Sequence, residues 1–173
     1  MSSFLNSYIK RITYYKTLGE QTFSQLDELD FHFQPNEESN SIGIIIQHMA
    51  GNMLSRFTNF LTEDGEKSWR KRDDEFDEQH LSIEELLSLW QKGWDCYLGA
   101  VQLLTEEDLE KIITIRSEQL TVTDALNRQM AHYPYHVGQI VYLGRLIKNK
   151  TWKNLSISKG QSQEFNDKMK HKA

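Results

Sequence analysis

Proline is nearly absent from this chain, and this constrains the fold more than any other feature of the sequence. Only two prolines, Pro35 and Pro134, occur among 173 residues. A proline inside a helix removes a backbone hydrogen bond and clashes with the preceding turn, so segments without proline permit long helices. In four such segments apolar residues recur three or four positions apart, which is the spacing of one helix face. The sequence therefore predicts an all-α fold.

The predicted helices are bounded by capping signals and by breaks in the apolar pattern. Ser82 and Glu85 form a capping box at the start of the third helix, and Thr123 is the predicted cap of the fourth. Four long helices with one long crossover connection are typical of a four-helix bundle. The predicted helices cover residues 3–29, 41–60, 82–101 and 123–148.

The connector, which we define as residues 62–81, is long and highly charged. Its Asp64-Gly65 pair is a turn signal, and Trp69 and Phe76 are candidate anchors to the helices. A charged connector is usually a solvated loop. Long loops in compact domains, however, often act as lids over a site. Both interpretations stay open for residues 63–78.

Two further segments lie outside the predicted helices. Residues 111–122 alternate and are rich in β-branched side chains, which predicts a short hairpin or extended segment before the fourth helix. Residues 1–150 are predicted to form one bundle domain, followed by a polar C-terminal tail at 151–173. The single cysteine, Cys96, excludes an internal disulfide and a cysteine-rich zinc site.

Charge and hydropathy limit the partners and the location that we expect. The formal net charge is −5, whereas phosphate binding is driven by clustered lysine and arginine, so no nucleic-acid partner is expected. The longest apolar run, residues 42–46, is too short to cross a bilayer, and the N-terminus does not resemble a signal peptide. We therefore expect a cytoplasmic protein with no membrane partner.

Three of the six histidines form the candidate metal site. His132 and His136 are four residues apart, so both rings lie on one face of the fourth helix, about 6 Å apart along its axis. His48 lies on an apolar stripe of the second helix, where an unpaired imidazole is costly to bury. Imidazole is a common ligand of divalent transition metals, and three such groups leave coordination positions open.

Other interpretations of these histidines are also open. A pair at this spacing is often two surface or hydrogen-bonded histidines, and a single His48 is more often a satisfied core residue than a ligand. Pro134 lies between the pair, so either a kinked helix continues through it or a new helix begins there. The uninterrupted helical pattern of residues 123–131 favours the kinked helix.

Four polar residues are candidate neighbours of the site. Asn52 and Gln139 lie on the same helix faces as His48 and His136, where they can orient ligands or form interhelical hydrogen bonds. Arg56 and Arg128 can bind an anionic group of a substrate, since guanidinium suits carboxylate or phosphate. For both arginines, a structural or surface ion pair is the alternative.

The histidine pattern resembles that of a known superfamily. His48, together with the segment HYPYHVGQI at residues 132–140, is similar to the DinB-like superfamily of metal-binding four-helix bundles. Residues 57–67, with Trp69 and Arg70, look like an uncharacterised branch of it that is related to bacillithiol transferases. The resemblance covers residues 5–150, and implies an up-down-down-up topology and a divalent metal held by one histidine of the second helix and two of the fourth.

The resemblance also implies candidate functions. The first is a metal-dependent transferase that uses a low-molecular-weight thiol, with a small-molecule substrate or thiol as its partner. The second is a non-catalytic bundle that binds a metal or small ligand, with a homodimer as one possible form, and the third is a metal-dependent hydrolase. The expected cofactor is one divalent transition metal. Zinc or nickel is the first expectation, and iron or manganese is the second. The sequence leaves open whether the protein is an enzyme.

Overall fold

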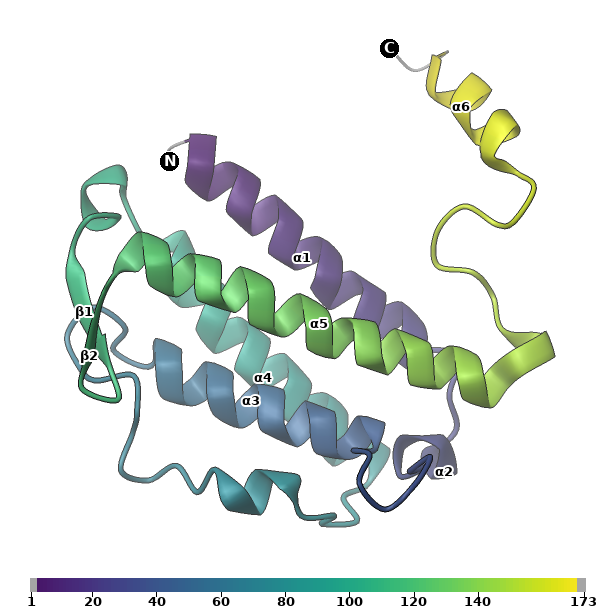
Figure 1. Ribbon diagram of the computed structural model, residues 1–173, viewed down its shortest axis with the longest axis horizontal. Helices are drawn as coiled ribbons and strands as arrows, with labels where there is room; N and C mark the ends of the chain where they lie inside the picture. The colour runs from purple at the N-terminus through teal and green to yellow at the C-terminus, as the bar shows by residue number, and fades with distance from the viewer. Residues whose placement is uncertain (1–2, 171–173) are drawn as a thin grey trace.

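A computed structural model describes residues 3–170 of the chain, and most of this part is helical (Figure 1). A small antiparallel hairpin of β1 (Ile112–Ile115) and β2 (Glu118–Thr121) interrupts the helices. Its register pairs Ile112 with Thr121 and Ile115 with Glu118. The long helices are α1 (Ser3–Phe23), α3 (Ile42–Phe57), α4 (Ile83–Gln102) and α5 (Val122–Lys148). The shorter elements are α2 (Glu28–Phe31), η1 (Asp73–Phe76), η2 (Glu106–Asp108), β1 (Ile112–Ile115), β2 (Glu118–Thr121), η3 (Asn149–Thr151) and α6 (Ser162–Lys170).

The four long helices contact one another in a closed ring. α3 packs on α4, α4 on α1, α1 on α5, and α5 on α3 (Figure 1). Large aromatic side chains fill the space between them, and Trp94, Tyr97 and Tyr133 are fully buried. The hydroxyl of Tyr8 donates to the carbonyl of Leu126 at 2.7 Å and accepts from Tyr97, so these buried hydroxyls are satisfied. The predicted all-α class therefore holds, apart from the hairpin.

Local capping chemistry fixes several of the helix ends, as the sequence predicts. The Ser41 hydroxyl accepts from the amide of Ile44 at the start of α3. Ser82 and Glu85 form the predicted capping box of α4. The hairpin occupies the predicted position before the last long helix. Pro134 lies inside α5, which is assigned as one helix, so His132 belongs to the same helix as His136.

Three predicted helix boundaries are wrong by a few residues. The first helix ends at Phe23 rather than at residue 29, because the chain turns and Asp27 begins the separate helix α2 through a capping box with Asp30. α3 ends at Phe57 rather than at residue 60, and Asn59 has a positive φ of 51°, which is incompatible with a continuing helix.

The cap of the last long helix is also displaced. Thr121, not Thr123, caps α5, and its side chain accepts from the amide of Asp124. The hydroxyl of Thr123 instead donates to the carbonyl of Leu109.

The C-terminal tail contains α6, none of whose residues is buried. Among the helices of residues 3–170, none combines the length and the apolar character that crossing a bilayer requires.

Gly93 brings α3 and α4 into close contact. A Cβ at this position would lie 2.9 Å from the Cα of Ala50 and 3.3 Å from the sulfur of Met53. Real Cβ atoms are not found this close to backbone, so any larger residue requires one of the helices to move. By contrast, a Cβ at Gly99 on the same helix meets no atom within 4 Å.

We expect Gly93→Ala to lower the free energy of unfolding by about 1–3 kcal/mol, the usual cost of overpacking a core. The higher helix propensity of alanine offsets about 1 kcal/mol at most. The matched variant Gly99→Ala gains the propensity without the clash and is expected to stabilise the protein slightly. Urea denaturation of both variants measures the difference, and destabilisation of equal size in both would contradict the close contact at Gly93.

Candidate metal centre

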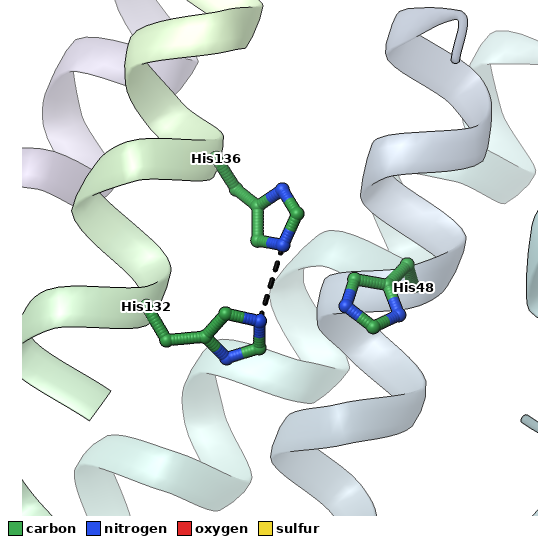
Figure 2. Close-up of side chains that lie close together, drawn as sticks. All are labelled: His48, His132 and His136. Carbon is green, nitrogen blue, oxygen red and sulfur yellow. Dashed lines mark hydrogen bonds between the residues drawn. The ribbon is translucent and has the colours of Figure 1, made fainter. Parts of the chain in front are cut away.

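Three imidazole rings converge between α3 and α5. Figure 2 shows His132 and His136 on one helix with His48 facing them from the other. The ring centroids lie 5.0 Å apart for His48 and His136, 5.6 Å for His48 and His132, and 4.8 Å for His132 and His136. One ring nitrogen of each histidine lies within 4.8 Å of the other two. The structure therefore brings together the three histidines that the sequence singles out.

Gln139 orients the ring of His136. Its side-chain carbonyl oxygen lies 2.8 Å from Nδ1 of His136, one helical turn away. A carbonyl oxygen only accepts hydrogen bonds, so Nδ1 carries the proton and Nε2 keeps its lone pair. This is the tautomer that a metal ligand bound through Nε2 requires. Of the two predicted roles of Gln139, the structure shows a contact with the ring rather than an interhelical hydrogen bond.

The connector supplies a carboxylate to His48. Oε2 of Glu75 lies 3.0 Å from Nδ1 of His48, and Arg70 donates two hydrogen bonds to the same carboxylate at 2.7 and 2.8 Å. Burial by itself raises the pKa of Glu75, but the bonds from Arg70 and His48 outweigh it and lower that pKa. Glu75 is therefore ionised at neutral pH, and Nδ1 of His48 donates to it. Nε2 of His48 is therefore the ring nitrogen that this contact leaves available to a metal.

The connector lies against α3 rather than extending into solvent. Gln47 donates to the backbone carbonyls of Glu75 and Asp77, and the ring of Phe76 packs on His48 at a centroid distance of 4.7 Å. Gly51 makes room for this contact, since a Cβ there would overlap the carboxylate of Glu75. Phe76 thus acts as the predicted anchor. Trp69 does not, because it is 55% exposed.

The two histidines of α5 contact each other directly. Their Nε2 atoms lie 3.1 Å apart (Figure 2). Burial lowers the pKa of His136 to about 4, and burial together with the neighbouring His136 and His48 lowers the pKa of His132 to about 3. Both rings are therefore neutral at physiological pH. Since Nε2 of His136 has a lone pair, Nε2–H of His132 donates to it.

This arrangement fits a divalent metal. Two nitrogens bound to one zinc ion at about 2.0–2.1 Å in tetrahedral geometry are about 3.3 Å apart, close to the observed separation of the two Nε2 atoms. A cation can take the place of the proton that His132 and His136 now share. Gln139 and Glu75 hold a proton on Nδ1 of His136 and of His48, which leaves Nε2 of each ring to coordinate, so the donor set suits zinc and its neighbours in the transition series.

A cavity of about 280 Å³ opens beside His132. The carbonyl oxygen of Gln129 is buried without a hydrogen-bond partner, and the side chain of Arg128 is 48% exposed. These groups offer an acceptor and a cation to a small polar molecule. The cavity is lined by Asn52, Arg56, Arg128, Gln129, Ala131, His132 and Tyr135.

The remaining predicted site residues have partners of their own. Asn52 accepts a hydrogen bond from the buried hydroxyl of Tyr133 at 3.0 Å, which is the interhelical alternative. Arg56 pairs with Glu66 at 2.8 Å and donates to the carbonyl of Gly65. Arg128 lies 3.5 Å from the carboxylate of Glu118. Both arginines thus form ion pairs, although each also lines the cavity.

Sequence reasoning missed Glu75 and Arg70 as parts of the site. Glu75 is 27 residues from His48 and lies in a segment with many other acids, so spacing offers no signal for it. The only hint is the apolar Phe76 beside it within a charged stretch. The sequence predicts a solvated loop or a lid for this connector, and the structure places its Arg70–Phe76 stretch beside His48 rather than in solvent.

Comparison with known proteins gives a family and no function. A search of curated proteins finds no significant match to the chain. A model of the family described as “Protein of unknown function (DUF1572)” matches residues 1–161, which include all three histidines and the connector. Because this match spans nearly the whole sequence, the chain belongs to the DUF1572 family.

Proposed function

We propose that this protein binds one divalent transition metal through His48, His132 and His136. The observation that carries the proposal is the convergence of three ring nitrogens within 4.8 Å from two helices. Partners at Nδ1 of His48 and His136 leave the opposite nitrogen, Nε2, of each ring to coordinate the metal. Zinc or nickel suits this imidazole set best, with iron or manganese as further candidates.

We further propose that the chain is a DinB-like four-helix bundle with the up-down-down-up topology. The ring of contacts among α1, α3, α4 and α5 supports it. So does the placement of the histidines, with one on the second long helix and two on the fourth. The DinB-like resemblance of the histidine pattern is the second support, and it links the chain to thiol transferases.

The function that we favour is a metal-dependent transfer of a low-molecular-weight thiol to a small electrophile. A bound metal would supply stabilisation of the thiolate, which is the reactive nucleophile. The protein contributes the cavity beside His132, where Arg128 can bind an anionic part of the thiol or its acceptor. Phe76 and the docked connector cover His48 and exclude water from that side.

A non-catalytic role is the second candidate. It is favoured by the position of the three histidines on helices that are far apart in the sequence. The histidines come from α3 and α5, two segments far apart in the sequence, so a metal would tie them together only in the folded state. Binding of this kind stabilises the fold directly. A metal-dependent hydrolase is the third candidate, because an open coordination position also suits activation of water.

Replacing single histidines tests the metal site. We expect protein purified without a histidine tag to contain about one ion per chain after dialysis, and His136→Ala, His132→Ala and His48→Ala each to lose most of it. Elemental analysis measures the content. His171→Ala, at a position outside the described residues, is the control and keeps the metal. Full occupancy in His136→Ala would show that the ligand assignment is wrong.

The carboxylate of Glu75 should tune that site without binding the metal. We expect Glu75→Gln to weaken metal affinity by about 10–100-fold, because the amide no longer supports the donor form of His48 as a carboxylate does. The matched variant Asp74→Asn removes a neighbouring charge whose side chain is exposed, and its affinity should stay within a factor of two or so of wild type. Competition with a chromophoric chelator measures both.

The transferase is tested by turnover. Metal-loaded protein is incubated with bacillithiol, glutathione or cysteine and a panel of electrophiles, and loss of free thiol is followed. We expect metal-dependent consumption of at least one thiol, with activity reduced in Arg128→Ala more than in Arg145→Ala, an arginine of α5 that does not line the cavity. No consumption, together with a large loss of melting temperature on chelation, would favour the non-catalytic role.

A further inference from the structure

A second cluster of metal-ligating side chains lies outside the three-histidine site. His32 follows α2, whereas Glu78 and His80 belong to the end of the connector. One ligand atom of each residue lies within 4.8 Å of the other two. The cluster therefore joins two segments that are more than forty positions apart in the sequence.

Hydrogen bonds hold the carboxylate of Glu78 at the centre of this cluster. Its Oε1 lies 3.0 Å from Nδ1 of His32 and accepts from the backbone amide of His80 at 3.0 Å. Its Oε2 accepts from the hydroxyl of Ser41 at 3.1 Å. Ser41 is the N-cap residue of α3, so the carboxylate is fixed to the rigid start of a long helix. Ligands oriented in this way are the ones that bind metals well.

The spacing within the cluster suits coordination. A nitrogen and an oxygen bound to one ion at about 2.1 Å are about 3.0 Å apart in octahedral and about 3.4 Å apart in tetrahedral geometry, and His32 and Glu78 lie 3.0 Å apart. The ring of His80 lies 6.1 Å from that of His32 between centroids. His32 and Glu78 are about one-fifth exposed, and His80 is exposed. An ion can therefore reach the cluster from solvent.

We propose that His32, Glu78 and His80 form a second binding site for a divalent transition metal. Two imidazoles and one carboxylate are a ligand set that suits zinc, and also iron(II). This site does not depend on the three-histidine centre, because the two share no ligand. It is the weaker of the two, since its ligands are more exposed than those of the three-histidine centre.

Metal at this second site would hold the end of the connector against the segment that follows α2. Glu78 follows Glu75, the partner of His48, by three residues, and Gln47 already holds the backbone between them. A further bond to His32 would close this end of the connector against the segment after α2. The middle of the connector carries Lys71 and Arg72, both exposed, which are sites for trypsin. Bound metal is expected to slow cleavage there.

Calorimetric titration of the full-length, untagged protein with zinc chloride tests the proposal. We expect two binding events in the wild type, with the weaker one abolished in His80→Ala and in Glu78→Gln. Asp77→Asn, which alters an adjacent exposed carboxylate, keeps both events. His80 is exposed, so its replacement is expected to leave the fold intact, and circular dichroism checks this.

The outcomes separate this site from the three-histidine centre. His136→Ala is expected to lose the tighter zinc-binding event and keep the weaker one. Zinc should still slow the cleavage of this variant by trypsin. A single event in the wild type, or two undiminished events in His80→Ala and Glu78→Gln, would overturn the second site and leave the first untouched. In that case the contact of His32 with Glu78 is a hydrogen bond alone.

Discussion

Three imidazoles that lie between α3 and α5, two of them buried and one partly buried, are the constraint on which the rest of the site depends. Burying a polar ring is costly unless each nitrogen finds a partner. Gln139 satisfies one nitrogen of His136, Glu75 satisfies one of His48, and the rings of His132 and His136 satisfy each other. The nitrogens left facing one another are those that a metal would use.

The connector follows from this constraint. A carboxylate close to His48 is itself expensive to bury, and Arg70 offsets that cost with two charge-assisted hydrogen bonds. Gly51 leaves the space in which the carboxylate lies. The segment between α3 and α4 is therefore held by the same polar network that orients the histidine, and it joins the candidate metal centre to the second cluster around Glu78.

Local signals in the sequence predicted most of the secondary structure. The helix start near Ser41, the cap at Ser82 and the β-branched stretch before α5 have short-range causes, so the sequence alone predicts them. The errors at residues 23–31 and at Thr123 arise where a nearby residue caps the helix instead, Asp27 at the start of α2 and Thr121 at the start of α5. Spacing also placed His132 and His136 on one face, because a helix repeats every 3.6 residues.

The sequence by itself determined a helical protein with three histidines at positions able to share an ion. Only the tertiary structure decided that His48 faces the other two, that Glu75 and Arg70 complete its surroundings, and that His32 meets Glu78 and His80. The reason is physical. Helix periodicity fixes neighbours within a few residues, whereas contacts between a loop and distant helices depend on how the whole chain packs, and no local pattern encodes that.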